Sequence, residues 1–417
     1  MQITFFGFLW LIILILSLIP KKNNFIFGCL LFSMVLQCDN VITISGMGVG
    51  PQVITCIVFL AKALLTPNKK IKYTIGKQTA ILLFLIIWIV LTVFVNESTI
   101  SLELIFRIIQ IGLYFLCFIK LARVRDSISK NSIYKTIDLL TIFLLTMGII
   151  QFLMSCHIIP KFSIIRILFY NDSSESIAFN ISGVYERMCS TLMEPSFFAP
   201  IIVSLFLYFL HKNNKKAKDY IILSIIVIEI ILTKSSTAFA AFLVVTMIFA
   251  YKNYKRDKFI IFACSYIVIF GFIYWTGLFD DVILNKLSTA SGITRTRLND
   301  AAFDLFLANP FFGNGYKSSS ASSLIFTLLA ETGIIGTLLY FCFALYSLKT
   351  VVKYQKQKES IFSWMFIVAV FCQFLAGSQL DLSSFWLIAF IYSINLSKYE
   401  GTLQLSNHHL KNKINWR

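Results

Sequence analysis

The sequence has 417 residues, of which 58% are hydrophobic and only 14% are charged. Its apolar residues form repeated runs of about 15–25 residues, as a bilayer core of about 30 Å requires, and this pattern excludes an ordinary soluble domain. The formal net charge of +17 lies in short basic clusters between the apolar runs. This placement is typical of membrane orientation and argues against a nucleic-acid partner.

The apolar runs predict an all-α polytopic integral membrane protein with about 12–13 transmembrane helices. The first run lacks a preceding basic segment and a small-residue cleavage site, so we interpret it as a retained helix. The runs at roughly 220–233 and 238–251 are short for a full crossing and could form a tight or tilted hairpin. The expected spans are roughly 3–19, 25–44, 48–66, 78–95, 104–122, 136–156, 196–210, 220–233, 238–251, 259–277, 323–348, 361–377 and 385–397.

Charge alternates along the connections and predicts the orientation of the spans. Every second connection is basic, whereas the others contain Asp39, Glu97, Glu103 and Asp381 with almost no Lys or Arg. By the positive-inside rule, the basic connections and the C-terminus face the cytoplasm. We therefore predict one transmembrane domain over 1–417, with two long outer loops at 157–194 and 279–322.

The nine cysteines show no metal-ligand spacing, and no nucleotide-binding loop is visible. We therefore expect neither a metal nor another cofactor. Most cysteines lie in apolar runs, where Cys behaves as a small hydrophobic residue. Cys156 and Cys189 lie toward the outer side and could form a disulfide in an oxidising compartment.

The first outer loop ends in SGVYERMCSTLMEPSFFAP, directly before a predicted span. Pro195 favours a helix start at that point. In one interpretation Glu194 caps this helix and Arg187 contacts lipid head groups. In the other, Arg187 binds an anionic group beside a carboxylate, either Glu194 or Glu186. Arg166, earlier in the loop, is a weaker candidate because interfacial snorkelling also explains it.

The second outer loop contains a segment with helical periodicity. Its apolar positions are Leu298, Ala301, Ala302, Leu305 and Phe306, and its polar positions are Asn299, Asp300 and Asp304. This pattern predicts a short amphipathic helix on the membrane surface, closed by Asn309-Pro310 and a turn at Gly313 and Gly315.

Arg295 and Arg297 are expected at the N-terminal end of this helix, where free N–H groups favour anions. Lys317 adds a further cation. Simple binding of anionic lipid is the alternative explanation.

Three charged residues, Arg107, Glu229 and Glu331, fall within predicted spans, where an unpaired charge is costly. Structural pairing is the default expectation for all three. Glu331 belongs to the run LLAETGIIG, whose Gly333 and Gly336 would let another helix approach closely.

Three segments carry a family resemblance: YERMCSTLMEPSFFAP, LTKSSTAFAAFL, and TRLNDAAFDLFLANPFFGNGY through LLAETGIIG. In these segments, over about residues 180–345, the chain resembles the bacterial O-antigen/capsule polymerase and ligase superfamily. Ligases commonly carry a His where this chain has Ser322, and often an Arg where it has Ser236. Both departures favour a Wzy-type repeat-unit polymerase. A ligase, or a flippase or exporter of lipid-linked sugars, remains the alternative.

The resemblance implies a glycosyltransferase that needs neither metal nor nucleotide sugar. It implies an undecaprenyl-pyrophosphate-linked oligosaccharide as substrate, on the outer face of the bacterial cytoplasmic membrane, and O-antigen or capsular polysaccharide as product. Membrane lipid is a partner, and a chain-length regulator and a flippase are candidate partners. The expected catalytic residues are Arg187, Glu194, Arg295 and Glu186; Arg297, Lys317 and Arg166 would bind pyrophosphate or glycan; Glu331, Gly313 and Gly315 would support the site.

Overall fold

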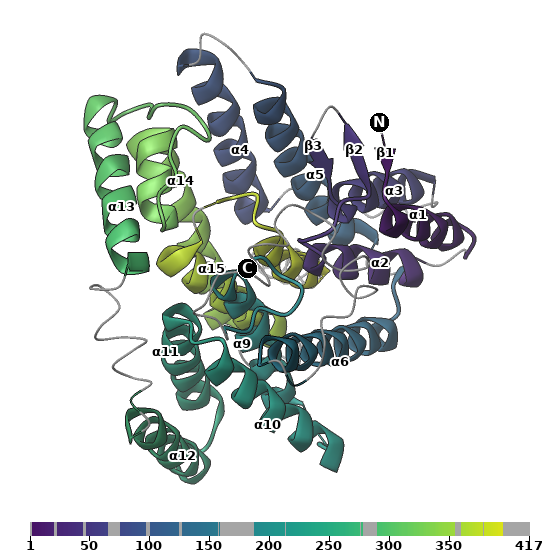
Figure 1. The fold of residues 1–417 in the computed structure, drawn as a ribbon, viewed down its shortest axis with the longest axis vertical. Helices are drawn as coiled ribbons and strands as arrows, with labels where there is room; N and C mark the ends of the chain where they lie inside the picture. Colours follow the sequence, from purple (N-terminus) through teal and green to yellow (C-terminus); the bar gives the residue numbers. More distant parts are fainter. Residues whose placement is uncertain are drawn as a thin grey trace, which may run out of the picture.

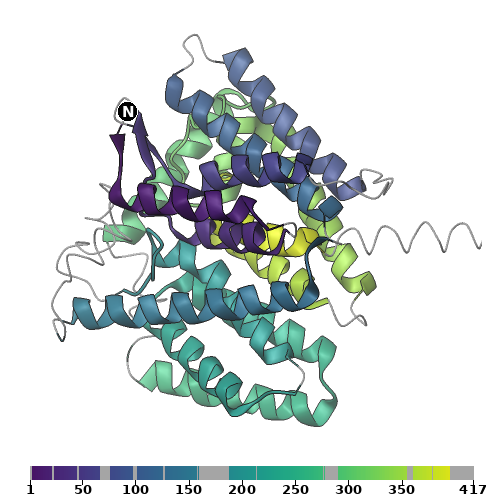
Figure 2. The ribbon, with the colours of Figure 1, turned by 90° about the vertical axis from the view of Figure 1, so that its right-hand side faces the viewer.

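The computed structural model describes residues 2–20, 23–44, 47–65, 76–96, 101–124, 127–156, 158, 187–212, 214–275, 277, 290–354, 360–377 and 379–394. Over these residues the protein is a bundle of α-helices with one small sheet beside the N-terminal helices (Figure 1). A second view shows most helices running side by side (Figure 2). Most of the first predicted outer loop (159–186) lies outside the described residues, whereas of the second only 279–289 does.

The described helices correspond to the predicted apolar runs, with one additional helix, α13. They are α1 (Phe5–Leu18), α2 (Asn24–Val35), α3 (Pro51–Leu65), α4 (Lys77–Asn96), α5 (Leu102–Val124), α6 (Lys130–Ser155), α9 (Pro195–His211), α10 (Ala217–Leu232), α11 (Ser236–Asn253), α12 (Arg256–Trp275), α13 (Ala290–Ala308), α14 (Leu324–Tyr354) and α15 (Ser360–Ala376). A further apolar helix covers Ser383–Ile394.

Helices α4, α5, α6, α11 and most of α14 are long and apolar enough to cross a membrane. Large apolar side chains remain exposed on them, including Phe84 and Phe94 of α4 at 60% and 67%. Such outward-facing side chains suit a lipid solvent. The protein is thus an all-α, multi-pass integral membrane protein, as its composition predicts.

The second and third predicted spans are shorter than expected because part of each is extended. Strands β1 (Gln2–Ile3), β2 (Ile42–Ile44) and β3 (Met47–Val49) form an antiparallel sheet in the order β1-β2-β3. Its register pairs Ile3 with Ile42 and Ile42 with Val49. The physical reason is local: the polar residues Gln37, Asp39 and Asn40 follow the end of α2, and the β-branched run after them favours a strand.

Helices α10 and α11 are joined by a tight turn, but α11 is longer than its apolar run suggested and is long enough to cross a membrane. Lys234 adopts a positive φ of 45° in the turn. The hydroxyl of Ser235 then accepts a hydrogen bond from the Ala238 N–H and caps α11.

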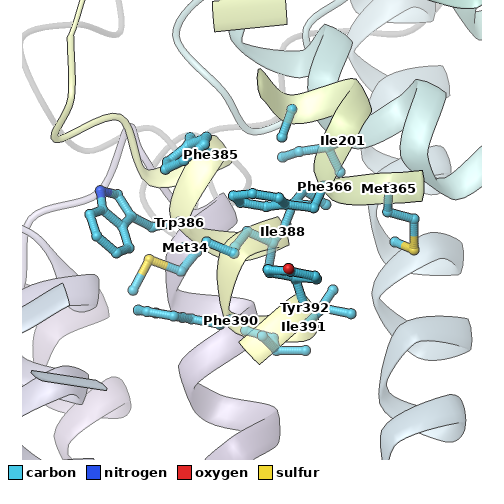
Figure 3. Packing of buried hydrophobic residues seen from close by; sticks show 14 of the residues in the cluster. Met34, Ile201, Met365, Phe366, Phe385, Trp386, Ile388, Phe390, Ile391 and Tyr392 are labelled. Carbon is cyan, nitrogen blue, oxygen red and sulfur yellow. The ribbon is translucent and has the colours of Figure 1, made fainter. Parts of the chain in front are cut away.

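The Ser383–Ile394 helix lies in the centre of the bundle and carries much of the core (Figure 3). The Tyr392 ring stacks on Phe366 of α15, with 4.5 Å between ring centroids. Ile388 and Phe390 are fully buried. This packing holds the segment directly before the helix, residues 379–382, against the rest of the protein.

Candidate active site

Residues Arg187–Met193 form a short segment, here called the strap, that leads into α9. Nearly every residue of the strap is held by a neighbouring element, and Ser190 adopts a positive φ of 56°. The strap is therefore rigidly placed before any ligand arrives. Its anchors are Met188 N–H to Leu232 O (3.2 Å), Cys189 N–H to Gln151 Oε1 (2.9 Å), Ser190 Oγ to Leu144 O (2.8 Å), Thr191 Oγ1 to Val35 O (2.7 Å) and Met193 N–H to Gln37 Oε1 (3.4 Å).

Arg187 begins the strap and lies against the α10–α11 turn, where its Nε donates to Thr233 O at 3.3 Å. Burial lowers the pKa of the Arg187 guanidinium, the positive charge of Arg295 lowers it further, and Glu194 partly offsets both effects. Arg187 is thus within electrostatic range of Arg295 and Glu194. Two guanidinium groups in a partly dry site repel each other, so a bound anion would stabilise them.

Glu194 joins the strap to α9. Pro195 occupies the first turn of α9, as predicted, and the Glu194 backbone is extended with φ −142° and ψ 149°. The carboxylate caps no N–H group of the helix and instead accepts a hydrogen bond from Ser196 Oγ at 2.9 Å. The interpretation of Glu194 as a helix cap is therefore wrong. The carboxylate is half-buried and interacts electrostatically with Arg187.

Helix α13 places Arg295 and Arg297 on different faces. Arg295 lies on the half-buried side with Gly292 and Asn299, spaced by three and four residues, whereas Arg297 is exposed. Arg297 lines a shallow surface hollow together with Asp300 and other α13 residues. Of the two arginines, only Arg295 shares the surroundings of Arg187.

Two expectations for α13 need correction. The helix begins at Ala290, so Arg295 and Arg297 lie in its second turn and not at its N-terminal end. The free N–H groups of a helix belong to its first turn, so the macrodipole argument does not reach these arginines. The predicted faces also differ, because packing against α14 buries Ala302 and leaves Leu298 and Ala301 exposed.

Ser322 is tied to the inner face of α13. Its N–H and its hydroxyl both donate to Asn299 Oδ1 at 3.0 Å. Asn299 lies one helical turn after Arg295, so this pair fixes the face that carries the arginine. The polar side predicted for Asn299 is therefore the inner side of the helix.

Helix α14 is broken at Gly333, which has φ 64° and ψ −166°. The loop after α13 fills the break: Asn314 N–H donates to Ala330 O, Gly315 N–H donates to Glu331 O, and Ile334 N–H donates to Pro310 O. A loop, and not the expected helix, thus approaches Gly333. Gly336 does face a helix, since its Cβ would lie 3.0 Å from Trp88 of α4.

Gly313 and Gly315 form the turn that approaches the break, and both have positive φ, 71° and 94°. A Cβ on Gly313 would lie 2.4 Å from the backbone carbon of Glu331. Only glycine permits this approach without a backbone shift. The buried Glu331 carboxylate faces the backbone N–H groups of Lys317 and Ser319. Glu331 therefore orders the loop that surrounds it.

Asp381 joins the second-loop region to α5. Its buried carboxylate pairs with Lys317 Nζ at 3.3 Å and with Arg107 Nη1 at 3.5 Å. Arg107 also lies 3.8 Å from Glu103 one turn away. Arg107 thus has the partners expected of it. Because Asp381 already offsets the charge of Lys317, that residue is a less available pyrophosphate ligand than its sequence position suggested.

Glu229 behaves differently from the other charged residues in helices. Its buried carboxylate lies against Gly148 of α6, where an added Cβ would be 2.9 Å from Oε1. Within the described residues neither carboxylate oxygen has a hydrogen-bond partner. The structural pairing expected for Glu229 is not found there.

The remaining candidates are two charged residues of the first outer loop, a cysteine pair and possible metal ligands. Glu186 and Arg166 lie outside the described residues. Cys156 and Cys189 are both free thiols, and burial raises the pKa of the Cys189 thiol to about 11. Within the described ranges, His, Cys, Asp and Glu side chains form no group of three suited to a metal ion.

Two glutamines of the site, Gln37 and Gln151, were missed because each lies within an apolar run. That position was itself a signal, since an amide in a span is costly unless it is hydrogen-bonded. Each holds a backbone N–H of the strap.

Comparison with known proteins adds one finding. A family model described as O-Antigen ligase matches residues 220–341, which include Arg295, Ser322 and Glu331 but not the strap. No curated protein matches the chain. Over residues 220–341 the chain is thus similar to the O-antigen ligase family, and its multi-pass helical fold agrees with that similarity.

Proposed function

We propose that this protein polymerises undecaprenyl-pyrophosphate-linked repeat units on the outer face of the bacterial cytoplasmic membrane. The growing glycan leaves its lipid carrier and joins the sugar of a new lipid-linked unit. The observation that carries the proposal is the grouping of Arg187, Arg295 and Glu194, which come from the two predicted outer loops.

Contacts between connections support the proposed orientation. Gln37 bonds to both Met193 and Ser383, and Asp381 pairs with Arg107 and Lys317. The charge pattern predicts that the connections containing Met193, Lys317, Asp381 and Ser383 lie on the outer side, and Gln37 and Arg107 lie near the ends of spans that adjoin that side. A single outer face with one site satisfies both the charge pattern and the contacts.

The chemistry follows from the side chains. The acceptor hydroxyl oxygen attacks the anomeric carbon of the donor glycan, and its proton passes to the Glu194 carboxylate. The bond from that carbon to the pyrophosphate oxygen breaks, and lipid pyrophosphate leaves with the electron pair. Arg187 and Arg295 would stabilise this charge, each worth about 3–4 kcal/mol by analogy with an oxyanion donor. A general base typically contributes about 10²–10⁴ in rate.

Ser322 favours polymerisation over ligation. The resemblance places a histidine at this position in ligases, and an imidazole could exchange a proton near neutral pH. Here the Ser322 hydroxyl is held on Asn299, and a serine hydroxyl does not titrate in that range. Ser236, in the first turn of α11, likewise stands at the position where the resemblance implies an arginine in ligases.

A reconstituted reaction tests the proposal. Purified protein with authentic lipid-linked repeat units is expected to produce a ladder of longer glycans, and Arg187→Ala is expected to abolish it at normal protein abundance. Absence of a ladder from wild-type protein that binds the donor would overturn the proposal. Normal polymerisation by Arg187→Ala would overturn the site assignment alone.

Ligase activity is the second candidate, because the matching family model is described as a ligase. A null strain separates the candidates. Single repeat units on the final acceptor indicate a polymerase, whereas long chains that stay on the lipid carrier indicate a ligase. Loss of all outward-facing units would instead indicate a flippase.

A further inference from the structure

We propose that Gln37 is a positioning residue for Glu194, an inference that rests on the proposed glycosyl transfer. Gln37 lies just beyond α2, where Leu36 leaves the helical conformation with φ −91° and ψ 64°. Its half-buried side chain connects the strap to the start of the Ser383–Ile394 helix. It lies outside the segment matched by the family model.

The hydrogen bonds determine the orientation of the Gln37 amide. Ser383 Oγ donates its single hydrogen to Met34 O at 2.8 Å. It must therefore accept from Gln37, whose Nε2 lies 2.6 Å away. With Nε2 facing Ser383, Gln37 Oε1 faces the Met193 N–H at 3.4 Å. A flipped amide would lose both hydrogen bonds, so these contacts permit one orientation of the Gln37 amide.

The Met193 N–H is the last strap anchor before Glu194. The anchors of Ser190 and Thr191 are accepted by the backbone carbonyls Leu144 O and Val35 O, which no substitution removes, and the Gln151 anchor lies five residues before Glu194. Gln37 is a side chain and can be removed. Without it, the Leu192–Met193 peptide loses this contact directly before Glu194, and we expect the carboxylate to shift relative to Arg187. A displacement of about 1 Å at a reacting group can cost about 10²-fold in rate.

The arginines do not depend on this contact. Arg187 is placed by Thr233 O and by the Met188 anchor at the far end of the strap, and Arg295 is placed by α13. Donor pyrophosphate binding should therefore survive the loss of Gln37. This separation predicts a lower kcat with little change in KM. Because a loss of folded protein also lowers the apparent kcat at constant KM, the rate has to be expressed per folded molecule.

Gln78 provides a matched control. It is a buried glutamine whose Nε2 donates to Ser347 Oγ and whose Oε1 accepts from Tyr392, within the helix bundle. Gln78→Leu removes a hydrogen-bonded amide of equal size away from the strap. It should lower protein abundance or thermal stability while leaving kcat and KM of the folded protein unchanged.

The experiment measures kcat and donor KM for full-length wild-type, Gln37→Leu and Gln78→Leu protein, per folded molecule, with lipid-linked repeat units. Gln37→Leu is expected to lower kcat by about 10²-fold and to leave KM within about twofold. An unchanged kcat, or a change equal to that of Gln78→Leu, would overturn the inference while the function stands. A wild-type protein that binds donor but makes no ladder would overturn both.

A second variant covers failure of Gln37→Leu to fold. Ser383→Ala removes only the hydroxyl that orients the amide, so the core loses little volume. We expect a smaller loss of kcat in the same direction, again with KM retained. Unchanged kcat in folded Ser383→Ala protein would contradict the argument that these contacts orient the Gln37 amide.

The conservative variant Gln37→Glu adds a second measurement, the pH dependence of the rate, which a merely structural role of Gln37 would not change. A carboxylate at this position keeps an acceptor for Met193 but places a second negative charge near Glu194. Arg187 and Cys189 both interact electrostatically with Glu194. A like charge raises a carboxylate pKa, so the acid limb of the rate profile should move to higher pH. If the acid limb of the pH–rate profile does not shift, Gln37 does not lie close to Glu194.

Discussion

Two arginines two residues apart illustrate how the site depends on individual side chains. Arg295 lies on the inner face of α13 near Arg187, whereas Arg297 is exposed in a hollow that Asp300 also lines. In the sequence both are equivalent, since each precedes the same apolar repeat. Their difference arises because successive helix residues are rotated by about 100°. We therefore expect the contribution of each arginine to catalysis to depend on the helix face that carries it, although both residues are arginines.

This difference makes a prediction for the two alanine variants. Arg295→Ala is expected to lower kcat by about 10²–10³-fold, because it removes a donor to the developing charge in a partly dry site. Arg297→Ala should lower the rate less, mainly through weaker donor binding that vanishes at high salt. Steady-state kinetics at two salt concentrations compare them. Equal losses in both variants would contradict the face assignment.

At the scale of elements, the break in α14 organises the loop that follows α13. Gly333 occupies a backbone region that other residues almost never adopt, and Phe311 O lies 2.3 Å from where its Cβ would be. The broken helix leaves carbonyl oxygens that the loop satisfies through Asn314 and Gly315. The break therefore holds the loop containing Lys317 and Ser322 against α14.

Gly333→Ala is accordingly expected to destabilise the protein by about 1–3 kcal/mol from backbone strain alone, with the clash adding to this. Gly112→Ala on α5 is the matched control, because no atom lies within 4 Å of its added Cβ. It should be neutral or slightly stabilising, since alanine favours a helix. Thermal unfolding in detergent measures both. A Gly333→Ala protein as stable as wild type would contradict the strained break.

At the scale of the molecule, the site combines segments distant in the chain. The strap contacts α2, α6 and α10, and Asp381 joins α5 to the loop after α13. The family match covers only residues 220–341, so the strap itself lies outside it, as do its anchors on Val35, Gln37, Leu144 and Gln151. The site thus depends on packing between the matched segment and the rest of the bundle.

Asp381→Asn tests this long-range connection. The change keeps a hydrogen-bond acceptor but leaves Arg107 and Lys317 without their shared carboxylate. Removing one partner of a fully buried pair costs about 3–5 kcal/mol. The loss here should be nearer about 1–2 kcal/mol, because both cations are partly exposed and screened by solvent. Thermal unfolding with and without high salt checks it, and an unchanged midpoint would show that the pairs contribute nothing.

Much of the fold could be predicted from local features alone. Apolar run length marked the helices, and Pro195 marked the start of α9. These features are local because a bilayer imposes its length on each span separately. The extended residues 42–49 escaped prediction, since an apolar β-branched run reads equally as strand or helix.

The sequence by itself determined the membrane class, the order of the apolar helices and the two long polar regions that interrupt them. Only the tertiary structure decided which polar groups interact: Arg187 senses the charge of Arg295, Lys317 pairs with Asp381, and Gln37 bonds to the strap. The physical reason is that hydropathy records where each segment lies relative to lipid. The rotation of a helix and the contact of distant loops are set by side-chain packing and hydrogen bonds between segments, which no single segment encodes.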